Sequence, residues 1–492
     1  MDSSNSISRR SFLRQTCGAM SSIPAVSTLL NMRLANYAAA DTLAAGAEAK
    51  TLVAIHLPGG MDGYNLLMPR DDARYANYLA SRTNLAVGRR APDEEPVANP
   101  TYRSPMIDLE EVGGGANGEL YGVNPGCSEI AEMFNGTGAF AGGRRLSFVS
   151  NVGSLIRPLS ISQYNAGLPG IDIPVGVAGH ARQSEQWQTT LPQGTVDLNG
   201  WLGRAGDLVQ AAYNRDQTSM NLSVSGNNLL QVGNDTRPFT YSSFSPLGLT
   251  GVNEDDPMNP LAMKNLMHRR LMEQGSENYV DDTFSELSNF SLDQQLTLKT
   301  SIDSFDESSL VAPFPATNTG RQFKDALVLI ATREAQGLRR QSLFLTSGSW
   351  DNHFDLPEPF FVGMRGLSEA MSAFQQNLDA LGLADSVISF TTSEFARTLR
   401  STGAGSDHAW GGPQMIFGGP IDSGKVLGRF PDLTLDSDDD IGRGGRMLPS
   451  SSCDEYFADM LRWFGITEDN MDIVLPNYGN FDHLPNLGYL KG

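Results

Sequence analysis

The sequence predicts an α/β fold: a mostly parallel sheet sandwiched by helices, with a largely helical insertion. Short, nearly continuous apolar runs lie at 51–57, 146–152, 342–346 and 386–392, and such runs are typical of strands buried on both faces, as in parallel sheets. Segments with helical spacing separate these runs, which indicates strands joined by helical crossovers. A chain of 492 residues is also long enough for one large α/β domain with insertions.

The expected elements follow from local patterns along the chain. Strands are placed where apolar residues run without interruption, and helices where they recur at helical spacing. Asn124-Pro125 opens one helix, because proline fits the first helical turn. In chain order, we expect a strand at 51–57, a helix at 124–134, a strand at 146–152, a helix at 322–336, a strand at 342–346, a helix at 369–381, strands at 386–392 and 415–417, and a terminal helix at 454–464.

Residues 41–492 are expected to form a single domain. The stretches 70–120 and 155–200 are rich in Pro, Gly and polar residues and are predicted to be long excursions. An inserted, mostly helical subdomain is predicted at about 205–320, because 258–271 and 281–304 show helical spacing with few breakers.

The N-terminus has the pattern of a twin-arginine signal peptide. Ser8-Arg9-Arg10-Ser11-Phe12-Leu13 precedes a short apolar run, which ends before Ala38-Ala39-Ala40. We therefore expect residues 1–40 to direct export, and the protein to be periplasmic or secreted. The apolar run is too short and too polar for a stable membrane span. Because twin-arginine export moves folded proteins, it favours a metal bound before export.

Composition indicates which partners are disfavoured and which ligand types a metal site would use. The formal net charge is −20, which disfavours nucleic acid as a partner. Once residues 1–40 are removed, Cys127 and Cys453 are the remaining cysteines. They form either one disulfide or two buried free thiols. The chain has only six histidines, so we expect a metal site to rely on carboxylates.

Acidic and histidine residues follow three of the predicted strands, and a further pair lies in a glycine-rich loop. The carboxyl ends of parallel strands meet at one edge of a sheet, where ligands bind in open α/β folds. Several carboxylates gathered there without a cation would repel one another. Mixed oxygen and nitrogen ligands suit zinc or manganese, and magnesium or calcium where nitrogens are fewer. The candidate ligands of a divalent metal are Asp62, Asp351, His353, Glu394, Asp407 and His408.

The motifs around these residues resemble those of the domain-of-unknown-function 1501 family of twin-arginine-exported bacterial proteins, often described as sulfatase-like. The motifs are 57–65, Trp350-Asp351-Asn352-His353, 393–398 and Ser406-Asp407-His408. The resemblance covers nearly the whole chain after residue 41. This family in turn resembles the alkaline phosphatase and sulfatase superfamily. The resemblance implies an alkaline phosphatase-like α/β sandwich, with Asp62, Asp351, His353 and the Asp407-His408 pair as metal ligands.

The superfamily resemblance also raises the question of the nucleophile. Superfamily hydrolases place Ser, Thr or Cys at a helix N-terminus, but here the matching position is Val123. Asn124 and Arg397 are candidates for holding an anion, and His180 lies in a loop that can reach the site. His483 is either a late ligand or an ordinary tail histidine. Without a side-chain nucleophile, a metal-activated water would have to attack.

Two functions remain open from the sequence. The first is an exported metal-dependent hydrolase of a phosphate or sulfate ester, acting on a small anionic ester or a glycan. The alternative is a non-catalytic envelope protein with a binding or structural role. It would keep the fold, and a structural metal would be compatible with it, but it would lack the nucleophile. The sequence leaves the substrate, the metal and the oligomeric state open.

Overall fold

The computed structural model describes residues 48–491 with gaps at 92–93, 96, 114–117, 195–198, 215–217 and 482–486, and only scattered residues between 244 and 296. The predicted signal peptide, most of the segment 258–304 on which the predicted helical insertion rests, and His483 lie outside the described residues. No described helix is long and apolar enough to cross a membrane.

A nine-stranded, mostly parallel sheet is the centre of the fold, as the sequence predicts. Its strand order is β11-β5-β10-β9-β1-β8-β6-β7, and β12 pairs with β5. The pairs made by β10 are antiparallel, and the other pairs in this sheet are parallel. The strands are β1 (Lys50–His56), β5 (Leu146–Gly153), β6 (Asn221–Ser223), β7 (Phe239–Thr240), β8 (Arg340–Thr346), β9 (Val387–Thr392), β10 (Gly412–Gly418), β11 (Val426–Leu427) and β12 (Ser451–Ser452).

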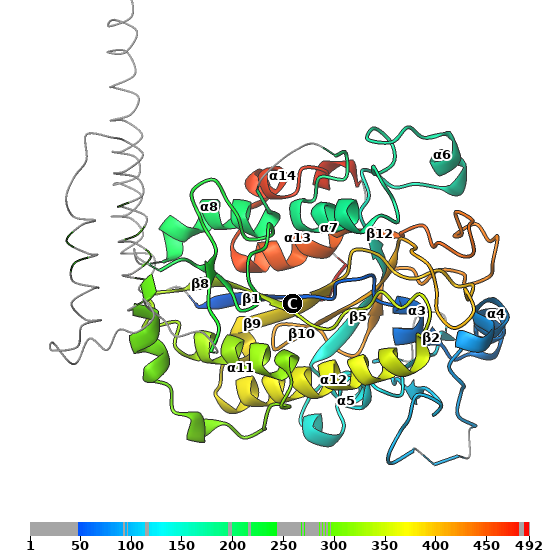
Figure 1. Cartoon of the computed structure of the whole chain (residues 1–492), viewed down its shortest axis with the longest axis horizontal. Coiled ribbons are helices and arrows are strands. Elements are labelled where there is room, and N and C mark those ends of the chain that lie inside the picture. Colours follow the sequence, from blue (N-terminus) through cyan, green and yellow to red (C-terminus); the bar gives the residue numbers. More distant parts are fainter. Residues whose placement is uncertain are drawn as a thin grey trace, which may run out of the picture.

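Helices cover both faces of this sheet (Figure 1). One layer contains α7, α8, α13 and α14, and the other contains α5, α11 and α12. These layers bury strands such as β1, whose residues Leu52 to Ile55 are 0% exposed, so a continuous apolar run is required. The helices are α5 (Ser128–Asn135), α7 (His180–Thr189), α8 (Trp201–Tyr213), α11 (Asn318–Ala331), α12 (Pro357–Ala380), α13 (Cys453–Phe464) and α14 (Met471–Val474).

Smaller elements lie at the end of the sheet where β1 finishes. A three-stranded antiparallel sheet of order β2-β4-β3 is built from β2 (Leu67–Pro69), β3 (Ile107–Asp108) and β4 (Tyr121–Val123). The helix α3 (Gly63–Leu66) follows β1, and the helices α4 (Asp72–Arg82) and α6 (Ile161–Ala166) belong to the long excursions. The described part of the predicted insertion adds β6 and β7 to the edge of the main sheet. Cys127 and Cys453 are both buried free thiols.

The register of the sheet aligns the ends of three strands. His56 at the end of β1 pairs with Thr346 at the end of β8 and with Thr392 at the end of β9. The loops that leave these strands therefore start side by side at one edge of the sheet. This alignment positions the candidate site.

Asp454 gives the fold a testable dependence on pH. Its side chain is buried in the first turn of α13, and burial raises its pKa to about 8, although the backbone N–H of Asn477 and the charge of Arg204 favour the ionised form. An unfolded aspartate has a pKa of about 3.9. Between these two values the folded protein keeps a proton that the unfolded chain releases, so stability falls as pH rises from about 4 to about 8.

We expect Asp454→Asn to flatten this pH dependence, because asparagine stays neutral and keeps an oxygen to accept the Asn477 bond. The variant should match the wild type near pH 5 and melt at a higher temperature near pH 8. Melting temperatures from pH 5 to pH 8 measure the difference. Equal slopes in both proteins would show that Asp454 does not titrate in this range.

Candidate metal centre

Three loops at the aligned strand ends carry most of the predicted site residues. The loop after β1 contains Gly59 and Gly60, the loop after β8 carries Asp351 and His353, and the loop after β9 carries Glu394 and Arg397. The chain then runs through Asp407 and His408 into β10. The structure thus brings these segments together at the carboxyl ends of the parallel strands, where α/β folds bind ligands.

Two glycines allow these loops to approach closely. Gly59 has φ +105°, and a Cβ atom there would lie 2.7 Å from the backbone nitrogen of Asp351. Gly60 has φ +76°, and a Cβ atom there would lie 2.1 Å from the ring of Phe395. Only glycine adopts such angles without strain and leaves room for the neighbouring chain.

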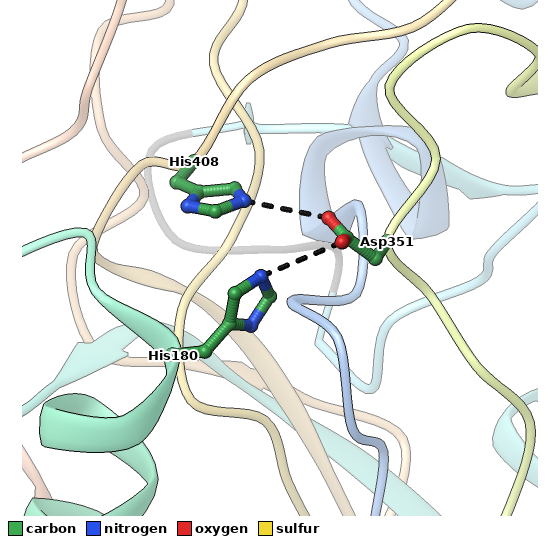
Figure 2. Close-up of side chains that lie close together, drawn as sticks. All are labelled: His180, Asp351 and His408. Atoms are coloured by element: carbon green, nitrogen blue, oxygen red, sulfur yellow. Dashed lines mark ion pairs between the residues drawn. The ribbon is translucent and has the colours of Figure 1, made fainter.

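Three histidine side chains surround Asp351. His353 Nε2 lies 2.9 Å and His408 Nε2 lies 3.4 Å from Asp351 Oδ1, and His180 Nε2 lies 3.6 Å from Asp351 Oδ2. His353 Nε2 and His408 Nε2 are 2.9 Å apart. Figure 2 shows His180, from the start of α7, and His408 pointing at opposite oxygens of this carboxylate.

The other ring nitrogens of two of these histidines have acceptors of their own. His408 Nδ1 lies 3.0 Å from the carbonyl oxygen of Ala178, and His180 Nδ1 lies 2.9 Å from Glu394 Oε1. Each acceptor holds the proton on Nδ1, which leaves the Nε2 lone pair directed at Asp351. Metal-binding histidines are commonly oriented this way by a backbone carbonyl or a carboxylate.

Arg397 connects the loops that carry Asp351 and two of the histidines by hydrogen bonds. Its guanidinium is fully buried and donates to the carbonyl oxygens of Gly60 at 2.8 Å and Ser406 at 3.1 Å, and also to that of Gly59. It also donates to Asp351 Oδ1. All three guanidinium nitrogens are therefore engaged within the protein.

The electrostatics favour an ionised Asp351 and a neutral His408. Burial opposes ionisation of Asp351, but the bond and charge of Arg397 outweigh it and lower the pKa of this carboxyl. Burial lowers the pKa of His408, and the charges of His180 and Arg397 lower it further. The hydrogen bond to the Ala178 carbonyl and the charge of Asp351 act in the opposite direction but are outweighed. An anionic oxygen and a neutral imidazole are the forms that bind metals.

Glu394 and Asp407 flank the cluster on different sides. Glu394 is buried, its Oε1 accepts from Gly59 N at 2.7 Å as well as facing His180, and its Oε2 has no hydrogen-bond partner. Asp407 is half exposed, caps the N–H of His408 at 2.8 Å and lies 3.6 Å from Arg446. Glu394 is thus placed to orient His180, while Asp407 can reach a cation beside His408.

Asp62 pairs with an arginine that the sequence did not single out. Asp62 and Arg82, the last residue of α4, are both buried and in contact through Asp62 Oδ2. Asp62 Oδ1 is buried without a partner. Burial raises the pKa of Asp62 despite the opposing charge of Arg82. Asp62 therefore lies at the aligned strand ends but outside the group of ligand atoms around Asp351.

The position at which the superfamily resemblance places a nucleophile is buried in this protein. Val123 is the last residue of β4 and is fully buried. The side chain of Asn124 is also buried; it donates to Asn65 O and accepts from Gly126 N, both at 3.0 Å. Burial raises the pKa of Cys127 far above its usual range, so its thiol stays protonated. None of these three side chains is a free nucleophile or a free anion ligand.

The donor set around Asp351 fits a divalent cation. Two groups, His180–Asp351–His408 and His353–Asp407–His408, place their ligand atoms within 4.8 Å of one another. Ligand atoms at 2.0–2.1 Å from a tetrahedral zinc ion lie about 3.3 Å apart, and the contacts to Asp351 span 2.9–3.6 Å. The buried Oε2 of Glu394, which faces no hydrogen-bond partner, lies on a residue that contacts His180. The set contains more imidazole than the scarcity of histidine led us to expect.

Comparison with protein families places this chain. Residues 49–441 match the family described as "Protein of unknown function (DUF1501)". The chain belongs to the DUF1501 family. No curated protein matches this DUF1501 protein. Among solved structures, a mutant of alkaline phosphatase PafA is 11% identical with a TM-score of 0.23, and the alignment covers 71% of this chain and 64% of the phosphatase. The DUF1501 protein thus spans less than two thirds of that phosphatase.

Substituting Gly59 tests how closely the loops must approach. We expect Gly59→Ala to destabilise the protein by about 1–3 kcal/mol, because φ +105° strains alanine and its Cβ would displace Asp351. Metal affinity should fall about 10- to 100-fold, as it does when a supporting contact of a ligand is lost. Zinc titration and urea unfolding measure the two effects. Gly142→Ala is the control, because a Cβ atom there would meet nothing within 4 Å. Wild-type metal affinity in Gly59→Ala would contradict the expectation.

Proposed function

We propose that this DUF1501 protein is an exported, metal-dependent hydrolase of a phosphate or sulfate ester that works in the periplasm or outside the cell. The observation that carries the proposal is the convergence of His180, His353 and His408 on Asp351. The acceptors of His180 Nδ1 and His408 Nδ1 support it, because both leave Nε2 free for a cation.

The residues of the site have different roles in this proposal. His180, Asp351, His353 and His408 would hold the cation, with Asp407 within reach of it. When bound, a divalent cation supplies a Lewis acid for the ester oxygen and lowers the pKa of water. Glu394 orients His180, and the buried charge of Arg397 offsets the charge of Asp351, with which it forms an ion pair.

Water is the nucleophile that this arrangement supports. Val123 is apolar, Cys127 is held as a buried neutral thiol, and Asn124 cannot attack an ester. We therefore expect hydrolysis without a covalent intermediate at the start of α5. Asp351 and the histidines bind and orient, and none of them needs to form a bond to the substrate.

A non-catalytic binding protein is the second candidate. The observation that favours it is the closed position at Val123 and Asn124, where the superfamily resemblance places the nucleophile and an anion contact. Such a protein would bind an ester or glycan without cleaving it, and this role is compatible with a structural metal but does not require one.

Metal analysis of the purified full chain distinguishes these functions. We would measure metal content and hydrolysis of phosphate and sulfate esters for the wild type, His408→Ala and Asp351→Asn. Asp422→Asn is the control, because Asp422 and Asp351 have side chains that are both 43% exposed and ion-paired.

About one or more metal equivalents in wild type and control, lost together with hydrolysis in both site variants, would support the hydrolase. Metal without any hydrolysis would favour the binding protein. No metal in the wild type after reloading would contradict the hydrolase and leave the binding or structural role.

A further inference from the structure

A polar hollow adjoins the candidate metal centre. It has a volume of about 370 Å³ and lies between the turn 398–402, Asp407 and the loop 435–444. Pockets of about 300–1,000 Å³ are the usual size for small-molecule sites. Its lining residues are Thr398, Arg400, Ser401, Thr402, Asp407, Leu435, Asp436, Asp440, Arg443 and Gly444.

The hollow and the centre share residues. Asp407 lines the hollow and also forms a group of ligand atoms with His353 and His408. Thr402 lines the hollow, and its hydroxyl donates to the carbonyl oxygen of His353 at 2.9 Å. A ligand that extends from a cation at the centre past Asp407 would therefore enter this hollow.

The two walls of the hollow are fixed to each other through their backbones. Leu399 N donates to Gly445 O at 3.1 Å, and Arg400 N donates to Gly444 O at 2.8 Å. Asp440 stabilises the second wall by accepting the N–H groups of Gly442 at 2.7 Å and Arg446 at 3.0 Å. The hollow is thus a preformed feature of the fold.

Two of its residues hold an unfavourable backbone conformation. Asp436 has φ +60° and Arg443 has φ +57°, angles that non-glycine residues rarely adopt. Ala178, whose carbonyl faces His408, has φ +66°. Strained backbone conformations are often found at ligand sites. Both Asp436 and Arg443 are exposed, so burial of their side chains does not explain the strain.

The chemistry of the lining matches a sugar ring. Arg400 and Arg443 offer donors, and the carboxylates of Asp407 and Asp436 offer acceptors, which suits hydroxyl groups that both donate and accept. Leu435 is the one aliphatic side chain among the lining residues, so an apolar ligand would gain little. The acidic residues also disfavour a second strongly anionic group.

We propose that this hollow binds the sugar residue of a glycan ester whose phosphate or sulfate group lies at the metal centre. The inference rests on the proposed function, and it names the substrate class. Arg443 and Asp436 would select sugar esters over simple alkyl esters by hydrogen bonds to ring hydroxyls. A site that hydrogen-bonds substrate hydroxyls discriminates strongly against analogues that lack them.

The test compares pairs of esters of the same acid on the metal-loaded full chain. Galactose 6-sulfate is paired with ethyl sulfate, and glucose 6-phosphate with ethyl phosphate. We expect kcat/KM for the sugar ester to exceed that for the ethyl ester by at least about tenfold in one pair. Asp436→Gly and Arg443→Gly should lower this ratio towards one, and glycine suits the positive φ at both positions. The ratio should not change in Arg365→Ala, an exposed arginine on α12.

Binding is measured separately by saturation-transfer NMR with the two sugar esters. Transfer to the ring protons that is lost in Ser401→Trp, which fills the hollow, would support the inference even if no ester is hydrolysed and the hydrolase proposal fails. A wild-type ratio near one, a ratio unchanged in both glycine variants, or absence of transfer to the ring would overturn the inference. Hydrolysis of ethyl esters would still support the hydrolase in those cases.

Discussion

Replacing Arg82 by methionine is expected to lower the free energy of unfolding by about 3–5 kcal/mol, the usual loss when a buried ion pair loses one partner. Arg82 and Asp62 are 0% and 1% exposed. Arg82 Nη1 also donates to the carbonyl oxygen of Thr398 at 2.8 Å. Methionine would leave Asp62 buried without a counter-charge. Asp62 Oδ1 already lacks a hydrogen-bond partner in the wild type. Urea unfolding of the metal-free protein measures the loss.

Two controls separate the charge from the volume of Arg82. The double variant Asp62→Asn with Arg82→Met should recover part of the loss, because no buried charge remains. Arg89→Met removes an exposed ion pair with Asp72 and should cost less than about 1 kcal/mol. A loss below that size in Arg82→Met would contradict the expectation. If added zinc restores the stability of Arg82→Met and not that of the double variant, Asp62 is a metal ligand, as the sequence resemblance implies.

The sheet could be predicted because its strands have a direct sequence signal. The expected strands 51–57, 342–346 and 386–392 correspond to β1, β8 and β9, and their parallel pairing brings the following loops together. The antiparallel direction of β10 was not predicted, because an apolar run such as 415–417 does not encode strand direction. The helix α4 was missed, since its exposed face is polar and only three of its residues are buried.

The site was predicted in part for a similar reason. Residues beyond strand ends are visible in a sequence, so Asp351, His353 and Glu394 could be found. The partners of Asp62 and His408 could not, because Arg82 lies in a polar excursion and the acceptor of His408 is the backbone carbonyl of Ala178. Every residue has a backbone carbonyl, so the residue type does not show which carbonyl will accept a hydrogen bond. The positive φ angles of Ala178, Asp436 and Arg443 were equally invisible.

Replacing Arg397 by methionine is expected to have a comparable effect on stability, about 3–5 kcal/mol, and to weaken metal binding as well. The guanidinium is fully buried and holds the carbonyl oxygens of Gly59, Gly60 and Ser406 together with Asp351. Without it the buried carbonyl oxygens of Gly60 and Ser406 and the partly buried acceptors on Gly59 and Asp351 lose a donor, which together costs several times the value of one ordinary hydrogen bond. Urea unfolding and zinc titration measure the two effects. Arg145→Met, which breaks a partly exposed pair with Asp379, is the control and should change both values little.

Arg397→Lys separates the charge of this residue from its shape. Lysine keeps the positive charge but cannot reach several carbonyl oxygens in one plane, as a guanidinium does. If Arg397 acts by fastening the loops, lysine and methionine should weaken zinc binding to a similar degree, about 10- to 100-fold. Tighter zinc binding in Arg397→Met than in the wild type would instead show that the guanidinium competes with the cation for Asp351. That result would contradict its role in orienting the ligand and would leave it a role in stability alone.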